Sequence, residues 1–146
     1  MIQRRSRPRK RSTGGLPGLI NQLDVLFAAY VKDRDGDTCV TCGTAGLTGS
    51  NWHAGHFIRR GNKALRFDPK NCHSQCGWVC NKGKRGAPRE YAFYLLDRYG
   101  EAEFRRLMQR KSVLKKWTRP ELERLIEAIR KGPAEYEMAY YEAELS

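Results

Sequence analysis

Cysteine and histidine residues gather in one short window of the chain. Five cysteines lie at positions 39, 42, 72, 76 and 80, and the three histidines, at positions 53, 56 and 73, fall inside the same stretch. Two cysteines that lie three or four positions apart can contact one metal ion from a tight turn, and two such pairs complete a tetrahedral site. The spacing therefore predicts a structural Zn²⁺ ion bound by four thiolates, those of Cys39, Cys42, Cys76 and Cys80.

Cys72 falls outside these two pairs. It lies in a strand-like stretch, where we expect it to be a small buried apolar side chain. A redox-active Cys-x-x-Cys motif would require a thioredoxin-like context, which the sequence lacks. A secreted disulfide framework would show an even number of cysteines and a secretion signal. Zinc-bound thiolates fit the pattern better than either alternative.

The histidines and asparagines near the cysteine pairs are suited to phosphodiester hydrolysis. This reaction needs a base that deprotonates water and a hard cation that stabilises the charge developing on phosphorus and on the leaving oxygen. His56 suits the base because an imidazole titrates near neutral pH. Asn81 and His73 are candidate ligands for a catalytic Mg²⁺ or similar ion, with phosphate and water as its other ligands. The alternative is that each histidine is structural.

Positive charge is concentrated in the same part of the chain. The 146 residues carry a net charge of +12, of which residues 39–89 contribute +8, whereas residues 90–146 are neutral. A solubilising excess would be spread evenly, so the concentration indicates an anionic partner, for which nucleic acid is the default. An anionic membrane surface fits less well, because this segment is not a basic amphipathic helix. Six side chains are predicted to contact the phosphate backbone of DNA: Arg59, Arg60, Lys63, Lys82, Lys84 and Arg85.

The flanking sequence predicts the elements that position these residues. Apolar residues at three- and four-residue steps predict a helix over 17–32, which the charged run at 33–37 ends. Short strands are expected at 52–58 and 72–76. Further helices are predicted over 89–99, over 101–111, from a capping box at Thr118 to Gly132, and over 134–145. The predicted fold class is α+β, with a small zinc-braced core and flanking helices.

The organisation predicted from these elements is one domain with a short arm. Residues 1–15 hold six basic and no acidic side chains, which predicts a flexible basic arm. Residues 16–146 form the domain, with the zinc core at about 38–90 and helical flanks at 16–34 and 89–145. No apolar run reaches the roughly 18 residues that a membrane-spanning helix needs, so we expect a soluble, cytoplasmic protein.

The order of these motifs resembles the zinc-bearing HNH (ββα-metal) endonucleases, and among them most closely the recombination proteins of lambdoid phages. The likeness covers most of the chain after residue 20. Its ordered series of Gly-His, Asn-x-His-x-Gln-Cys and Cys-Asn is far more specific than a single Cys-x-x-Cys. The motifs that carry it are Cys39-x-x-Cys42, Ala54-Gly55-His56-Phe57, Arg66-Phe67-Asp68-x-x-Asn71-x-His73-x-Gln75-Cys76 and Cys80-Asn81-x-x-Lys84.

The resemblance implies two antiparallel strands and a helix around one catalytic Mg²⁺ or Mn²⁺ ion, braced by the zinc. It implies cleavage of DNA at branched recombination intermediates, such as a Holliday junction or a D-loop, in the cytoplasm of a host cell if the protein is phage-encoded. By the same resemblance, His56 is the general base, Asn81 is a ligand of the catalytic metal, and Asn71 ties the loop between the strands and orients the base. A homodimer would suit symmetric cleavage of a junction.

The sequence departs from the family pattern at two places. Many relatives have an acidic ligand directly before the base, where this chain has Gly55, so His73 or His53 is expected to replace it. The second cysteine pair has one extra residue, which changes the helical phase after Cys80. The absent acidic ligand leaves a second hypothesis open, that of a non-catalytic zinc-ribbon protein that binds nucleic acid.

Overall fold

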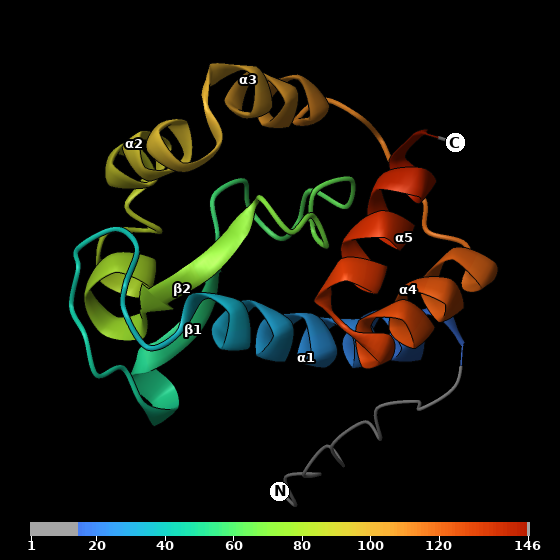
Figure 1. Cartoon of the computed structure of the whole chain (residues 1–146), viewed down its shortest axis with the longest axis horizontal. Helices are drawn as coiled ribbons and strands as arrows, with labels where there is room; N and C mark the ends of the chain where they lie inside the picture. The colour runs from blue at the N-terminus through green and yellow to red at the C-terminus, as the bar shows by residue number, and fades with distance from the viewer. Residues whose placement is uncertain (1–14, 146) are drawn as a thin grey trace, which may run out of the picture.

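The computed structural model describes residues 15–145, so the predicted basic arm lies outside the described residues except for Gly15. Within this range a two-stranded antiparallel sheet is flanked by α-helices, which confirms the α+β class (Figure 1). The strands are β1, Trp52–His56, and β2, Cys72–Cys76, and short helical turns η1, Gly49–Asn51, and η2, Gly77–Gly83, flank the hairpin. The α-helices are α1, Leu16–Asp35; α2, Pro88–Tyr99; α3, Glu101–Arg110; α4, Arg119–Lys131; and α5, Pro133–Leu145.

Helix α1 continues through part of the charged run that was expected to end it. Pro17 lies in its first turn, and the helix ends only at Gly36, whose φ of 74° favours glycine. The reason is that the last turn has partners on β2 and in the loop that leads into it. Arg34 donates to the carbonyl oxygens of Pro69 and Cys72, both at 2.6 Å, and Asp35 accepts the backbone N–H of Ser74 at 3.0 Å.

The hairpin register determines which side chains share a face. Gly55 pairs with His73, and His56 pairs with Cys72. Strand β1 ends at His56, two residues earlier than predicted, because the N–H of Ile58 donates to the side chain of Asn71 at 2.8 Å rather than to a strand carbonyl. Since side chains alternate across a strand, His56 and Cys72 face one side of the sheet and Gly55 and His73 face the other.

The two faces of the hairpin pack against different helices (Figure 1). Cys72 joins Leu23 and Phe27 of α1 in a core that also includes residues of α4 and α5. On the other face, the ring of His73 lies among the aromatic side chains of α2. The interstrand loop and α2 share a second core with α3, built around Ile58, Leu65, Tyr91, Leu95 and Leu107.

The helices that follow the hairpin agree with the sequence-based prediction. Thr118 and Glu121 form the expected capping box at the start of α4, and Gly132 ends that helix. Helix α4 packs mainly against α1 and α5, as the shared core of these three helices indicates. Within residues 15–145, no helix combines the length and apolar character needed to cross a membrane.

The buried carboxylate of Asp35 joins α1 to the hairpin. It contacts the guanidinium of Arg34 at 2.7 Å and Nδ1 of His73 at 2.8 Å, and its side chain is only 3% exposed. Burial opposes its ionisation, but hydrogen bonds from His73 and Arg34 outweigh burial and hold the pKa of Asp35 well below its usual range. Nδ1 of His73 lies 2.8 Å from Asp35 and 2.9 Å from Nη2 of Arg34, and Nε2 lies 3.3 Å from the hydroxyl of Tyr99. Burial lowers the pKa of His73, so the ring is neutral at pH 7.

We predict that Asp35→Asn lowers the free energy of unfolding by about 3 kcal/mol, because the Arg34 guanidinium would stay buried without its counter-charge. Urea denaturation followed by circular dichroism measures this at pH 7. The difference from wild type should shrink below about pH 4, because a depressed native pKa gives stability that is lost as the carboxylate is protonated. The matched control is Asp33→Asn, an exposed aspartate on the same turn, for which we expect a change within about 0.5 kcal/mol. Equal effects of the two substitutions would contradict the prediction.

Candidate metal centre and active site

Four cysteine sulfurs converge as the spacing predicted. The Sγ atoms of Cys39, Cys42, Cys76 and Cys80 all lie within 4.8 Å of one another, and those of Cys42 and Cys76 are 3.8 Å apart. Tetrahedral zinc with Zn–S bonds of about 2.3 Å places its sulfurs about 3.8 Å apart, so the cluster fits this ion. Burial raises the pKa of Cys80 to about 12, whereas at Cys39 burial is outweighed by hydrogen bonds from Thr41 and from backbone amides, which lower the pKa to about 6. The four cysteines are therefore positioned to bind a metal ion, in agreement with the predicted structural zinc.

The geometry of helical turn η2 shows how the extra residue between Cys76 and Cys80 is accommodated. The turn is a π-helix, in which the N–H of Lys84 donates to the carbonyl of Val79, five residues earlier, at 2.7 Å. This wider turn brings Cys80 back over Cys76, whose sulfur accepts the backbone N–H of Cys80 at 3.4 Å. Gly83 is required here, because a Cβ atom at this position would lie 2.9 Å from the carbonyl oxygen of Trp78.

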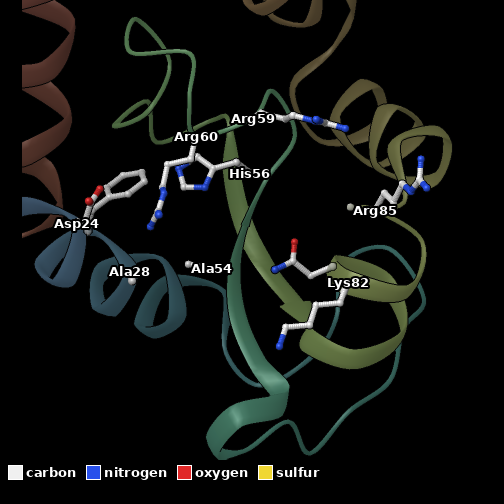
Figure 2. A pocket seen from close by; sticks show the side chains of 11 residues that line it. Asp24, Ala28, Ala54, His56, Arg59, Arg60, Lys82 and Arg85 are labelled. Carbon is white, nitrogen blue, oxygen red and sulfur yellow. The ribbon is translucent and has the colours of Figure 1, made fainter. Parts of the chain in front are cut away.

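A cavity with a volume of about 490 Å³ lies along β1, between α1 and η2 (Figure 2). Its lining comes from α1, β1, the start of the interstrand loop and η2 with the turn after it. The lining residues are Asp24, Phe27, Ala28, Ala54, His56, Arg59, Arg60, Asn81, Lys82, Arg85 and Gly86. The predicted base and the predicted metal ligand thus line one cavity, together with four of the six predicted DNA-binding cations.

The ring of His56 is held by its surroundings in one orientation. Its Nε2–H donates to the carbonyl oxygen of Arg66 at 2.8 Å, and the ring packs 6.1 Å from the ring of Phe27. This leaves Nδ1 as the acceptor nitrogen, with the buried thiol of Cys72 at 3.8 Å. Burial is the main cause that lowers the pKa of His56, so the ring is neutral at pH 7. Cys72 itself is fully buried in the core, as predicted.

Asn71 fixes the loop that supplies the carbonyl for His56. Its Oδ1 accepts the N–H of Ile58 at 2.8 Å, and its Nδ2 donates to the carbonyls of Ile58 and Leu65 at 2.9 Å and 3.1 Å. The loop is fixed a second time by Arg66, whose guanidinium binds both carboxylate oxygens of Asp24 on α1. Asn71 therefore ties the interstrand loop, and with it the carbonyl of Arg66 that accepts from His56.

Asn81 is oriented by His53. A His53 ring protonated at Nε2 donates to the carbonyl of Ser50 at 2.9 Å and accepts at Nδ1 from the amide nitrogen of Asn81 at 2.8 Å. This hydrogen bond occupies the amide nitrogen of Asn81 and leaves its oxygen available to the cavity. His53 was expected as a candidate metal ligand, but both of its ring nitrogens already have partners within the protein. Gly77 makes room for this ring, because a Cβ atom there would lie 2.6 Å from Nε2 of His53.

His73 does not reach the cavity, which argues against the expectation that it replaces the absent acidic ligand. The strand pleat turns it to the opposite face from His56, where it is fully buried against Asp35 and Tyr99. Gly55 faces the same side, and a Cβ atom there would lie 1.9 Å from Oε1 of Gln75. A side chain at position 55 would have to displace the buried side chain of Gln75, which gives the absence of a carboxylate directly before His56 a steric reason.

Four of the six predicted DNA-binding residues line the cavity, namely Arg59, Arg60, Lys82 and Arg85, whereas Lys63 and Lys84 are exposed outside its lining. None of the six forms a salt bridge with any carboxylate of residues 15–145.

Arg85 begins a run of three left-handed residues, with φ values of 52°, 92° and 48° at Arg85, Gly86 and Ala87. Such backbone is costly for residues other than glycine and occurs where the surroundings enforce it. Here Gly86 donates to the carbonyl of Cys80 at 2.9 Å and accepts from Gln75 at 3.0 Å. The strained turn therefore fixes Arg85 at the edge of the cavity.

Sequence reasoning missed Asp24 and the structural role of Arg66. Asp24 contributes the one carboxylate side chain among the cavity-lining residues, and both of its oxygens are bound by Arg66. Asp24 is also the one acidic residue between positions 1 and 32 and lies on the predicted amphipathic helix. A single acidic residue on this helix could have been singled out from the sequence. Its partner, Arg66, could not, because it is 42 residues away in the chain.

We predict that Cys42→Ser abolishes stoichiometric zinc binding and lowers the free energy of unfolding by at least about 3 kcal/mol, because a metal bound only to the folded state stabilises that state. Zinc content by atomic emission and urea denaturation measure the two effects. The control is Cys72→Ala, which should keep one zinc per chain and lose about 1–2 kcal/mol through lost packing. Full zinc content in Cys42→Ser, or zinc loss in Cys72→Ala, would contradict the four-cysteine assignment.

Comparison with known proteins identifies the family to which the chain belongs. No curated protein and no solved structure matches the chain significantly. A family model described as Bacteriophage Lambda NinG protein matches residues 2–136, a range that includes the hairpin, η2 and every residue of the candidate site. Because this match spans well over half of the 146 residues, the chain belongs to the NinG family.

Proposed function

We propose that this NinG-family protein is a metal-dependent DNA endonuclease of the HNH type. Membership of the family implies a function related to phage recombination. The observation that carries the proposal is that a neutral imidazole, that of His56, and an oriented amide oxygen, that of Asn81, line one cation-rich cavity. The succession of β1, β2, η2 and α2 has the strand-strand-helix order of a ββα-metal core, which supports the same assignment.

His56 acts as the general base. The neutral ring takes a proton from the attacking water at Nδ1, while its Nε2–H keeps donating to the carbonyl of Arg66. Because this carbonyl belongs to the loop fixed by Asn71, the ring keeps its orientation when it becomes charged. An imidazole held in one tautomer and one rotamer needs little reorganisation in the transition state.

Asn81 provides the protein oxygen for a catalytic divalent ion. Magnesium in proteins usually keeps several waters and is held by one or two carboxylates together with substrate phosphate. The one carboxylate of the cavity lining, Asp24, is bound by Arg66, so an ion at Asn81 would have the amide oxygen as its protein ligand and would take its other ligands from phosphate and water. When bound, the ion supplies charge stabilisation for the phosphate and the leaving oxygen. His53 serves as the residue that orients Asn81, through the 2.8 Å hydrogen bond between them.

The four cations of the cavity position the phosphate backbone of DNA. Arg59 and Arg60 lie on the loop side of His56, and Lys82 and Arg85 lie on the η2 side (Figure 2). Contacts of this kind hold DNA without reading its sequence, since the charge of the phosphates is the same at every base pair. Such contacts select no DNA sequence, which is compatible with a branched recombination intermediate as substrate.

A zinc-containing protein that binds nucleic acid without cleaving it is the second candidate. The observation in its favour is that the carboxylate of Asp24 is occupied by Arg66, which leaves no free carboxylate among the cavity-lining residues. Incubation with branched and linear DNA in Mg²⁺ or Mn²⁺ distinguishes the candidates. The endonuclease nicks DNA and binds an exchangeable ion beyond the zinc, whereas the binder does neither.

We predict that His56→Ala lowers kcat/KM for cleavage by about 10²- to 10⁴-fold, the usual contribution of a general base. In the wild type, the rate should rise with pH as His56 loses its proton and should level off above its pKa. Burial lowers this pKa from 6.5, so the acidic limb of the profile lies below pH 6.5 and the plateau is reached by pH 7.

Steady-state cleavage of a fluorescently labelled junction between pH 5 and pH 8.5 measures both effects, and zinc content shows that the variant is folded. The matched control is Arg130→Ala, an exposed residue of α4 outside the cavity lining, which should cleave at the wild-type rate. Unchanged cleavage by His56→Ala would refute the assignment of the base.

We predict that Arg60→Ala and Lys82→Ala each weaken binding to all DNA sequences equally and reduce the slope of log Kd against log salt by about one, because each removes one phosphate contact. Fluorescence anisotropy between 50 and 300 mM NaCl measures this slope, with Arg130→Ala again as the control of equal charge change. A sequence-dependent loss, or an equal change in the control, would be inconsistent with cations that contact the backbone at the cavity.

A further inference from the structure

The three tryptophans of the chain have different surroundings. The ring N–H of Trp52 donates to Ser74, and that of Trp117 donates to the carbonyl of Lys63. Each of these two rings also has a lysine ammonium over its face, that of Lys32 or of Lys115. Trp78 is 62% exposed, and within residues 15–145 its ring has neither a hydrogen-bond partner nor an aromatic or cationic neighbour. Among the three tryptophans, Trp78 is therefore the one whose ring is open to solvent.

The backbone that carries Trp78 is held firmly. Its N–H donates to Oδ1 of Asn51 at 3.1 Å, and the same oxygen accepts the N–H of Gly77 at 3.0 Å. The residue lies between the two cysteines of η2, Cys76 and Cys80, which the zinc site ties together. A tryptophan has only two side-chain torsions to lose on binding, so a ring on a fixed turn is well prepared to stack on a partner.

A cation of η2 projects from the same side of the turn as this ring. Trp78 and Lys82 are four residues apart, close to one helical turn, so they lie on the same side of η2. Lys82 lines the cavity of His56 and Asn81, and the exposed Lys84 and Arg85 follow it. Val79, the next residue of η2, is 56% exposed. An exposed aromatic ring next to cations offers a stacking surface for a base and charge for its phosphate.

We propose that Trp78 stacks on an unpaired nucleobase of the DNA strand that enters the cavity. This inference rests on the proposed nuclease function and specifies its substrate class. In fully paired duplex both faces of a base are covered by its neighbours, whereas a base at a branch, flap or gap exposes a face. A stacking contact beside a cavity that binds phosphates without reading sequence therefore favours DNA that carries unpaired bases next to the cut strand.

The test compares binding of the full-length, zinc-loaded protein to two DNAs without added Mg²⁺, so that cleavage does not enter the result. One DNA is a fully paired duplex, and the other is the same duplex with a short unpaired flap. Trp78→Ala should weaken binding to the flap DNA by about 5- to 100-fold, which corresponds to one stacked base, and should change binding to the duplex by less than about 2-fold. Trp78→Phe should restore most of the affinity for the flap DNA.

The matched control is Phe93→Ala, which removes an aromatic ring of α2 that is 59% exposed and should leave both affinities unchanged. A second measurement uses intrinsic fluorescence. The emission difference between wild type and Trp78→Phe isolates Trp78, and flap DNA should quench it more strongly than duplex.

Equal losses on both DNAs, no loss on the flap DNA, or no quenching of Trp78 would overturn the proposal. The result is separable from the proposed catalysis. If Trp78 acts as predicted while His56→Ala cleaves normally, the catalytic assignment fails and the stacking stands. If His56→Ala is inactive while Trp78→Ala binds flap DNA normally, the stacking alone fails.

Discussion

Four thiolates that converge on one point hold the functional part of this protein together. Cys42 and Cys76 are 34 residues apart in the chain, yet their sulfurs lie 3.8 Å from each other. The apolar cluster around them is small, because it contains little besides the cysteines, Leu47, Ala87 and part of Trp52. Hydrophobic burial alone gives such a region little stability. A metal bound to the four cysteines would tie the end of β2 to η2, the turn that carries Asn81.

The pleat of the hairpin turns two histidines on neighbouring strands to opposite faces of the sheet. His56 faces α1 and the cavity, where its hydrogen bond to the carbonyl of Arg66 holds the ring in one orientation. His73 faces α2, where Asp35 and Tyr99 bind both of its ring nitrogens. Contacts of the His73 face with α1 and α2 make the hairpin rigid. This rigidity also fixes the side chains on the opposite face, which lines the cavity. A ring that is held in one orientation and kept neutral by burial suits proton transfer near pH 7.

The zinc cysteines, both strands and the helices were predictable from the sequence, because ligand spacing, apolar periodicity and a capping box are local signals. The roles of His53 and His73 were not, since they depend on Ser50, Asp35 and Tyr99, which tertiary packing brings to the rings. The π-helical turn was also missed, because its extra residue is explained only once Cys76 and Cys80 share one site. The ββα-metal core and its nuclease chemistry remain a proposal, supported by the order of elements and by the shared cavity.

The central claim is that the zinc-braced hairpin and η2 present His56 and Asn81 to one divalent ion. A crystal structure of the protein soaked in Mn²⁺, with anomalous data collected at the manganese edge, tests it most directly. The account predicts one manganese peak in the cavity at coordination distance from Oδ1 of Asn81, on the side of β1 that His56 faces, and separate from the zinc at the four cysteines. A peak at His73 or His53 instead, or an empty cavity at saturating Mn²⁺, would contradict it.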